Sequence, residues 1–107
     1  MATVKMILDG KEVELRPTPH AAITISRRAD GFIPALERVA KYDEDLIAGI
    51  IALGIGADPD AIEATVARTG VAELVEPVTE FIYLLIGGGR VPDDSDTVRH
   101  WAAPASA

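Results

Sequence analysis

Cysteine is absent from this 107-residue chain, which contains two histidines, one tryptophan, two tyrosines and two phenylalanines. Without cysteine, the chain forms no disulfide, no thiolate metal site and no cysteine nucleophile. The scarcity of aromatic side chains disfavours a platform on which the bases of single-stranded nucleic acid would stack. Any imidazole chemistry depends on the two histidines.

Basic charge is also scarce, because 10 lysines and arginines stand against 17 aspartates and glutamates and the formal net charge is −7. Nucleic acids and anionic membranes attract clustered basic residues, so neither is expected as a partner. The most apolar stretch, residues 46–55, is interrupted by Gly49 and Gly54 and is too short to span a bilayer. The first residues lack the basic-then-apolar order of a signal peptide. We therefore expect a soluble, cytoplasmic protein.

The composition that is present, 49% hydrophobic and 25% charged, predicts a packed core. Apolar and polar residues alternate over residues 4–8 and lead into Asp9-Gly10. Asp-Gly between alternating segments predicts a two-residue type I′ turn, because both central positions need a positive φ. The resulting hairpin has one largely apolar face and places Lys5 opposite Glu14 on the other.

Capping signals divide the next part of the chain into short helices. The predicted helical segments begin at Thr18-Pro19, Asp43 and Asp58-Pro59 and end at Asp30-Gly31, Gly54 and Gly70. A further helical run begins at Ile33-Pro34. The pattern leaves open whether the segments around Asp30-Gly31 are two helices or one kinked helix.

A last helix is expected over residues 72–86, before the glycines at 87–89. Pro77 leaves two alternatives, a helix kinked at this proline or a helix that begins near it. Residues 90–107 show no periodicity and are expected to form a disordered tail. The fold class is therefore α+β, with an N-terminal two-stranded hairpin packed on a bundle of four to five short helices. The expected organisation is a single globular domain over residues 1–89, with the hairpin at 3–16 and the helices at 18–87.

The motifs indicate no catalytic, cofactor or metal site, and we expect a protein that is not an enzyme. His20 has no serine or acid beside it by local spacing and is interpreted as an exposed helix residue, while His100 lies in the expected tail. Gly54-Ile55-Gly56 follows a helix rather than a strand, so it is interpreted as a helix stop and not as a dinucleotide motif. Asp94-Ser95-Asp96 has no helix after it, which disfavours an acyl carrier protein.

The order of features carries more information than any motif. A hairpin with Leu8-Asp9-Gly10 leads into Leu15-Arg16-Pro17-Thr18, a helix and Gly31, and later segments run from Ile50 to Gly54, Ile62 to Val66 and Phe81 to Gly88. This order, over residues 4–89, resembles the small tail-protein family of gene transfer agents and long-tailed phages. Members of that family are labelled tail assembly chaperone or tail tube protein.

The resemblance implies a non-enzymatic role in tail assembly. Tail assembly chaperones bind the long helical tape measure protein, keep it soluble, help recruit tail tube protein around it, and are absent from the finished particle. Two alternatives stay open: a structural tail tube component, and a small cytoplasmic protein-binding adaptor unrelated to phage. The oligomeric state, a homo-oligomer included, is also open.

An exposed apolar surface would engage the tape measure protein. The candidate residues for this surface are Ile47, Ile50, Ile51, Phe81, Tyr83 and Leu84. The alternative is that most of them belong to the core. In that case Tyr83, which lies off the main apolar stripe of the last helix, is the best candidate for an exposed contact.

Overall fold

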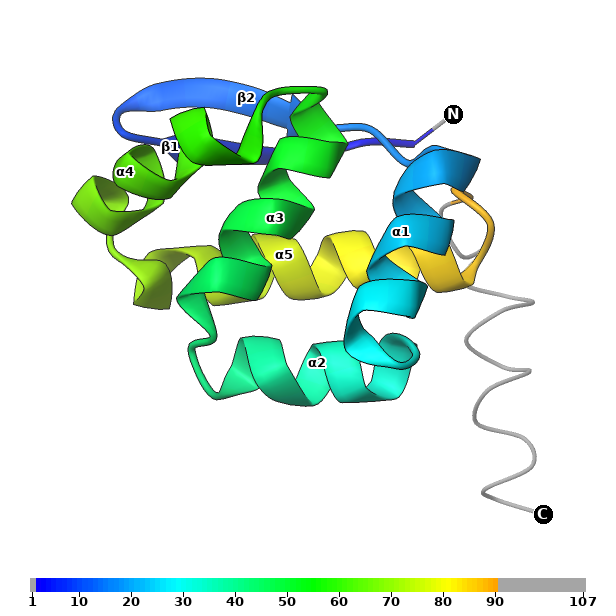
Figure 1. Ribbon diagram of the computed structural model, residues 1–107. Coiled ribbons are helices and arrows are strands. Elements are labelled where there is room, and N and C mark those ends of the chain that lie inside the picture. Colours follow the sequence, from blue (N-terminus) through cyan, green and yellow to red (C-terminus); the bar gives the residue numbers. More distant parts are fainter. Residues whose placement is uncertain (1, 91–107) are drawn as a thin grey trace, which may run out of the picture.

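A two-stranded hairpin and five helices make up residues 2–90, the part of the chain that this computed structural model describes (Figure 1). The elements are β1 (Val4–Leu8), β2 (Lys11–Leu15), α1 (Pro19–Ala29), α2 (Phe32–Ala40), α3 (Glu44–Ile55), α4 (Pro59–Thr69) and α5 (Val71–Ile86). The α+β prediction is confirmed, with the upper number of helices. The tail expected over residues 90–107 lies, apart from Arg90, outside the described residues.

The hairpin has the predicted turn and register. Asp9 and Gly10 have φ of 52° and 80°, as a type I′ turn requires. Lys5 pairs with Glu14, and the other pairs follow the same register. Every second residue of β1 is buried, so the hairpin rests its apolar face on the helices. A two-stranded ribbon is only marginally stable by itself, and this packing supplies the missing stability.

The first two helices are separate, which decides between the two alternatives left by the sequence. Asp30 and Gly31 have φ of 62° and 114°, outside the helical range, and the chain turns there between α1 and α2. The Thr18 hydroxyl accepts a hydrogen bond from the backbone N–H of Ala21 at 3.0 Å, so the predicted cap of α1 is confirmed.

The caps of α3 and α4 are also as predicted. The Asp43 carboxylate accepts a hydrogen bond from the N–H of Leu46 at 3.1 Å, and the Asp58 carboxylate accepts one from the N–H of Asp60 at 3.1 Å. Gly70 ends α4 and α5 begins at the next residue. The starts of these helices are therefore set by side-chain caps that can be recognised in the sequence.

Pro77 lies inside α5, which begins at Val71. The alternative in which the helix begins near Pro77 is therefore wrong. Proline has no N–H, so the carbonyl of Glu73, four residues earlier, lacks its helical donor. The helix tolerates this loss because Leu74, Val78 and the later apolar residues of α5 bury a long stripe against the core.

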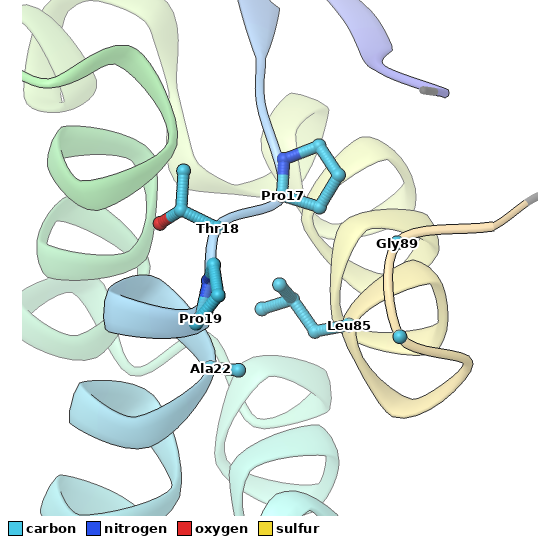
Figure 2. Close-up of a pocket in the computed structure, with 7 residues that line it drawn as sticks. Pro17, Thr18, Pro19, Ala22, Leu85 and Gly89 are labelled. Carbon is cyan, nitrogen blue, oxygen red and sulfur yellow. The ribbon is translucent and has the colours of Figure 1, made fainter.

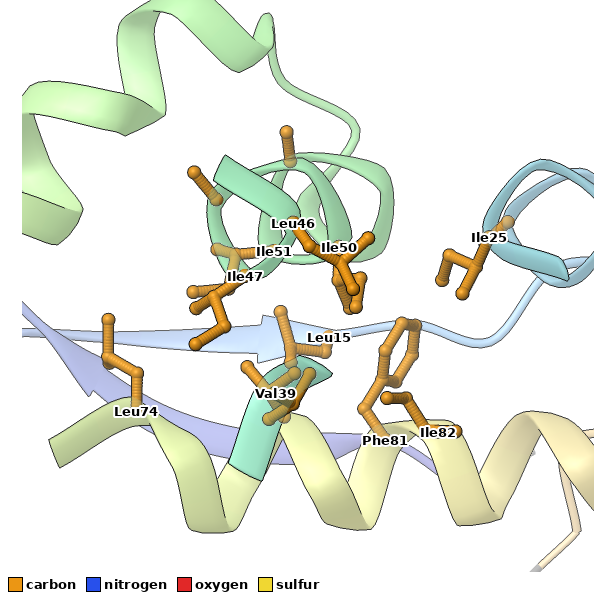
Figure 3. Close-up of a cluster of buried hydrophobic side chains, with 14 of the residues drawn as sticks. Leu15, Ile25, Val39, Leu46, Ile47, Ile50, Ile51, Leu74, Phe81 and Ile82 are labelled. Carbon is orange, nitrogen blue, oxygen red and sulfur yellow. The ribbon is translucent and has the colours of Figure 1, made fainter. Parts of the chain in front are cut away.

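The core lies between α3 and α5, with the hairpin along one side of both helices (Figures 1 and 3). Figure 3 shows side chains of α3 on one side, side chains of α5 on the other, and Leu15 of β2 between them. The largest fully buried side chains are Phe81, Leu15, Ile25, Leu46, Ile47, Ile50, Ile51, Leu74, Ile82, Val39, Val66 and Val78. All five helices and the hairpin thus contribute side chains to one hydrophobic cluster.

Gly54 does not end α3, contrary to the sequence prediction. The helix continues to Ile55, and Gly56 caps it. A Cβ at Gly54 would lie 2.9 Å from Cδ2 and 3.2 Å from the Cα of Leu15, so the missing side chain allows the end of β2 to touch α3. The N–H of Arg16 donates a hydrogen bond to the carbonyl of Gly54 at 2.9 Å and fixes this contact.

Replacing Gly54 with alanine is expected to lower the free energy of unfolding by about 1–2 kcal/mol in urea denaturation. Overpacking costs about 1–3 kcal/mol, and the gain in helix propensity offsets part of it. Gly49 is the matched control, because a Cβ there meets only the guanidinium of Arg28, the far end of a flexible side chain that can shift within its exposed ion pair with Asp45. Gly49→Ala is expected to stay within about 0.5 kcal/mol of the parent. Equal losses in both variants would contradict a close contact specific to Gly54.

The Asp43 cap predicts a pH-dependent stability. The hydrogen bond from the N–H of Leu46 is the main cause that holds the pKa of Asp43 below its ordinary value. The Nε of Arg38 also donates a hydrogen bond to the Asp43 carboxylate, at 2.8 Å, and lowers the pKa further, whereas burial opposes the shift. A lowered folded-state pKa gives stability that is present above the unfolded-state pKa and lost as the pH falls through the folded-state pKa.

Asp43→Ala is therefore expected to cost about 1 kcal/mol at neutral pH. The difference from the parent should shrink as the pH falls below about 4. Denaturation curves from pH 7 to pH 2 measure it, with Glu37→Ala on the exposed side of α2 as control. A difference that is constant over this range would show that the carboxylate makes no charge-dependent contribution.

Candidate functional site

The structure buries five of the six residues that the sequence offered as partner-binding candidates. Ile47, Ile50, Ile51 and Phe81 are at most 1% exposed, and Leu84 is 6% exposed. The expectation of an exposed apolar surface around these five is therefore wrong, and the alternative interpretation as core is confirmed. They face the interior because α3 is surrounded by β2, α4 and α5 and buries nearly its whole circumference.

Tyr83 is the sixth candidate, and this residue of α5 is 52% exposed. The structure thus separates it from the other five candidates, as its place off the apolar stripe indicates. Four more large apolar residues are exposed: Ile7, Ile23, Ile33 and Tyr42. Exposed apolar residues that stand alone need no functional explanation, so their surroundings decide their significance.

A hollow of about 270 Å³ lies where the start of α1 meets the end of α5 (Figure 2). Its lining residues are Pro17, Thr18, Pro19, Ala22, Leu85, Gly88 and Gly89. Figure 2 shows the Leu85 side chain directed across the hollow toward Pro19 and Ala22. The floor is apolar and its walls carry small or rigid residues, so a bulky side chain from outside can enter.

A second hollow, of about 290 Å³, adjoins the first because Ala22 lines both. Its other lining residues are Ile23, Ser26, Arg27 and Phe32. The Ile23 side chain is 50% exposed there. We call the two hollows together the α1–α5 apolar surface. It extends from the cap of α1 along one side of that helix to the start of α2.

The one charged residue that lines the α1–α5 apolar surface is basic. Arg27 lines the second hollow, and the exposed Arg90 follows Gly89, which lines the first. Arg28, the neighbour of Arg27, is by contrast engaged in an ion pair with Asp45 on α3. In a chain of formal net charge −7, an apolar surface that carries an arginine and no acidic lining residue is a local exception. It favours a partner whose apolar face is bordered by acidic side chains.

No group of three or more metal-ligating side chains occurs within residues 2–90. His20 is exposed in the first turn of α1, as interpreted from the sequence, and His100 lies outside the described part. None of the helices from α1 to α5 is long and apolar enough to cross a lipid bilayer.

Comparisons of the chain with protein families, curated proteins and solved structures give no match. Inferences about function therefore depend on the surface of residues 2–90.

Sequence reasoning missed most of the α1–α5 apolar surface. In the sequence, Pro19 and the glycines at 87–89 mark only where helices begin and end, and Leu85, which is 6% exposed, also belongs to the core. Their meeting depends on how the end of α5 lies against the start of α1, a contact between residues far apart in the chain. The signal that could have indicated it is the cluster of two prolines beside an exposed Ile23 on α1.

Substitutions in α5 can test that Phe81 belongs to the core and Tyr83 to the surface. Phe81→Ala is expected to lower the free energy of unfolding by about 3–5 kcal/mol, because it opens a cavity in the core. Tyr83→Ala, two residues along the same helix, is expected to change it by less than about 0.5 kcal/mol. Urea denaturation of both variants measures these values. If Phe81→Ala is unfolded, Ile47→Val, expected to cost about 0.5–1.5 kcal/mol, provides the core value.

Proposed function

We propose that this protein is a non-catalytic assembly factor that binds the apolar face of a helical partner. The proposed partner is the tape measure protein of a phage or gene transfer agent tail, and the proposed role is that of a tail assembly chaperone in the host cytoplasm. The tail tube protein, recruited around the tape measure protein, is the second proposed partner. The protein would be absent from the finished particle.

The observation that supports this proposal is the α1–α5 apolar surface. Its two hollows share Ala22 and are arranged one after the other, so they suit successive side chains of an amphipathic helix. An apolar helix docked there would cover Ile23 and the side of Leu85 that faces the first hollow. Arg27 favours an acidic residue beside the apolar stripe of that helix.

A second observation, the small sheet, favours this function over that of a tail tube component. Tube subunits form rings through the edges of large sheets, whereas residues 2–90 contain one two-stranded sheet. A single short hairpin does not supply such a ring. The adaptor alternative uses the same kind of surface with a different partner, so only identification of the partner separates it from the chaperone.

The test is an affinity purification of the full chain from its own host while tail particles are being produced, followed by mass spectrometry. A long coiled-coil tape measure protein is expected to copurify. Ile23→Glu is expected to reduce its recovery about tenfold, because docking of an apolar helix would bury the introduced carboxylate. Tyr42→Glu is the matched control, since Tyr42 is also exposed and lines neither hollow of the α1–α5 apolar surface.

Other results would overturn the proposal in identifiable ways. Recovery of host proteins alone would favour the adaptor. Presence of the protein in purified, complete tails would favour the structural component. An equal loss of the tape measure protein with Ile23→Glu and Tyr42→Glu would show that the α1–α5 apolar surface is not the binding surface.

A further inference from the structure

The outer edge of β1 has unpaired backbone groups. Residues that flank a two-residue turn form a hydrogen-bonded pair, and such pairs alternate along an antiparallel ladder. Leu8 and Lys11 flank the turn, so the N–H and C=O groups of Ile7 and Lys5 point away from β2. Within residues 2–90, no other element donates to or accepts from the main chain at these two positions. The edge is therefore open for pairing with another strand.

This edge borders a groove of about 340 Å³ between β1 and α5. The groove is lined by Lys5, Met6, Ile7, Glu73, Glu76, Pro77 and Glu80. Three consecutive residues of β1 take part, although their side chains alternate between the core and the outside. The groove consequently follows the edge of the strand rather than one of its faces, and an extended segment can lie along it.

The opposite wall of the groove is acidic. Glu73, Glu76 and Glu80 are exposed along one side of α5, and none of them forms an ion pair with another residue in the described part of the chain. Because Pro77 has no N–H, the carbonyl of Glu73 also lacks its helical donor. Lys5 is the one basic side chain that lines the groove. Its walls thus present mainly hydrogen-bond acceptors and negative charge.

We propose that this groove binds an extended, basic peptide segment that adds to β1 as a third strand. The main chain of the incoming segment would pair with the backbone groups of Lys5 and Ile7, which is the usual mode of strand addition. Every second side chain would point toward α5, where lysine or arginine meets the three glutamates. The side chains between them would point outward, beside the exposed Ile7.

Tyr83 extends the same side of α5. It follows Glu80 by three residues and Glu76 by seven, so helical periodicity places the three side chains in one row. Its half-exposed ring continues the wall beyond the glutamates and offers a face on which a cation can rest. Tyr83, the one exposed residue of the original candidate set, thus lies next to the groove between β1 and α5 without lining it.

The β1–α5 groove and the α1–α5 apolar surface have no lining residue in common. They also differ in charge and in the shape of segment they accept: the groove suits a basic strand, and the apolar surface suits an acidic-edged helix. The inference therefore goes beyond the proposed assembly role and does not depend on it. Each can fail without the other.

The test uses the purified full chain and a blocked, fluorescent peptide that alternates lysine and valine, with a glutamate–valine peptide of equal length for comparison. Fluorescence anisotropy is expected to show binding of the lysine–valine peptide alone. Hydrogen exchange followed by NMR is expected to show slower exchange at the amides of Lys5 and Ile7. Methylation of alternate backbone nitrogens in the peptide, which removes its ladder donors, is expected to abolish this protection.

Two charge-matched double variants locate the peptide. Glu76→Gln with Glu80→Gln is expected to weaken binding about tenfold. Glu37→Gln with Glu63→Gln, which changes the net charge equally on the exposed sides of α2 and α4, is expected to weaken it less than about twofold. The far-ultraviolet circular dichroism of both variants should match the parent, because all four side chains are exposed.

Several outcomes would overturn the inference. These are the absence of binding, equal binding of the glutamate–valine peptide, equal loss in the two double variants, and amide protection at positions other than β1. Binding that survives backbone methylation unchanged would indicate charge attraction without strand addition and would overturn it too. Ile23→Glu, placed in the other surface, is expected to leave peptide binding unchanged.

Discussion

The contact between Leu15 and Gly54 joins the two halves of this fold. Leu15 ends β2 with its side chain fully buried, and the absence of a side chain at Gly54 lets the backbone of β2 approach α3 directly. The hydrogen bond from Arg16 to the Gly54 carbonyl then directs the chain toward the cap of α1. Hairpin position, the start of α1 and the closure of the core over α3 all depend on this approach. The α1–α5 apolar surface depends on it in turn, because Pro17 and Pro19 lie just beyond it.

The sequence predicted the elements well because their boundaries are local. A positive-φ turn at Asp9-Gly10 and the side-chain caps at Thr18, Asp43 and Asp58 each need only the few residues around them. The sequence did not predict Gly54 correctly, because glycine ends helices and also admits close neighbours. Only the three-dimensional position of Leu15 shows which of these two roles applies.

The candidate site was harder to predict than the fold for a related reason. A hydrophobic side chain on a helix serves either the core or a partner, and its periodicity is the same in both cases. Ile47 and Ile50 proved to be core because α3 is covered on several sides, which the sequence of α3 does not reveal. Tyr83 could be distinguished from these core residues because it lies off the apolar stripe of α5, which is visible in the sequence of that helix alone.

The acidic residues divide into those that the fold uses and those that it leaves free. Asp43 and Asp58 cap helices, and Asp9 and Asp45 pair with arginines. Glu73, Glu76 and Glu80 have no such role in the described chain, and they stand beside the outer edge of β1, where the backbone groups of Lys5 and Ile7 are unpaired. Repulsion among neighbouring glutamates on one side of a helix opposes folding slightly. A basic segment bound at β1 would reduce the repulsion among the glutamates. Its main chain would also supply hydrogen-bond partners for the unpaired backbone groups of β1.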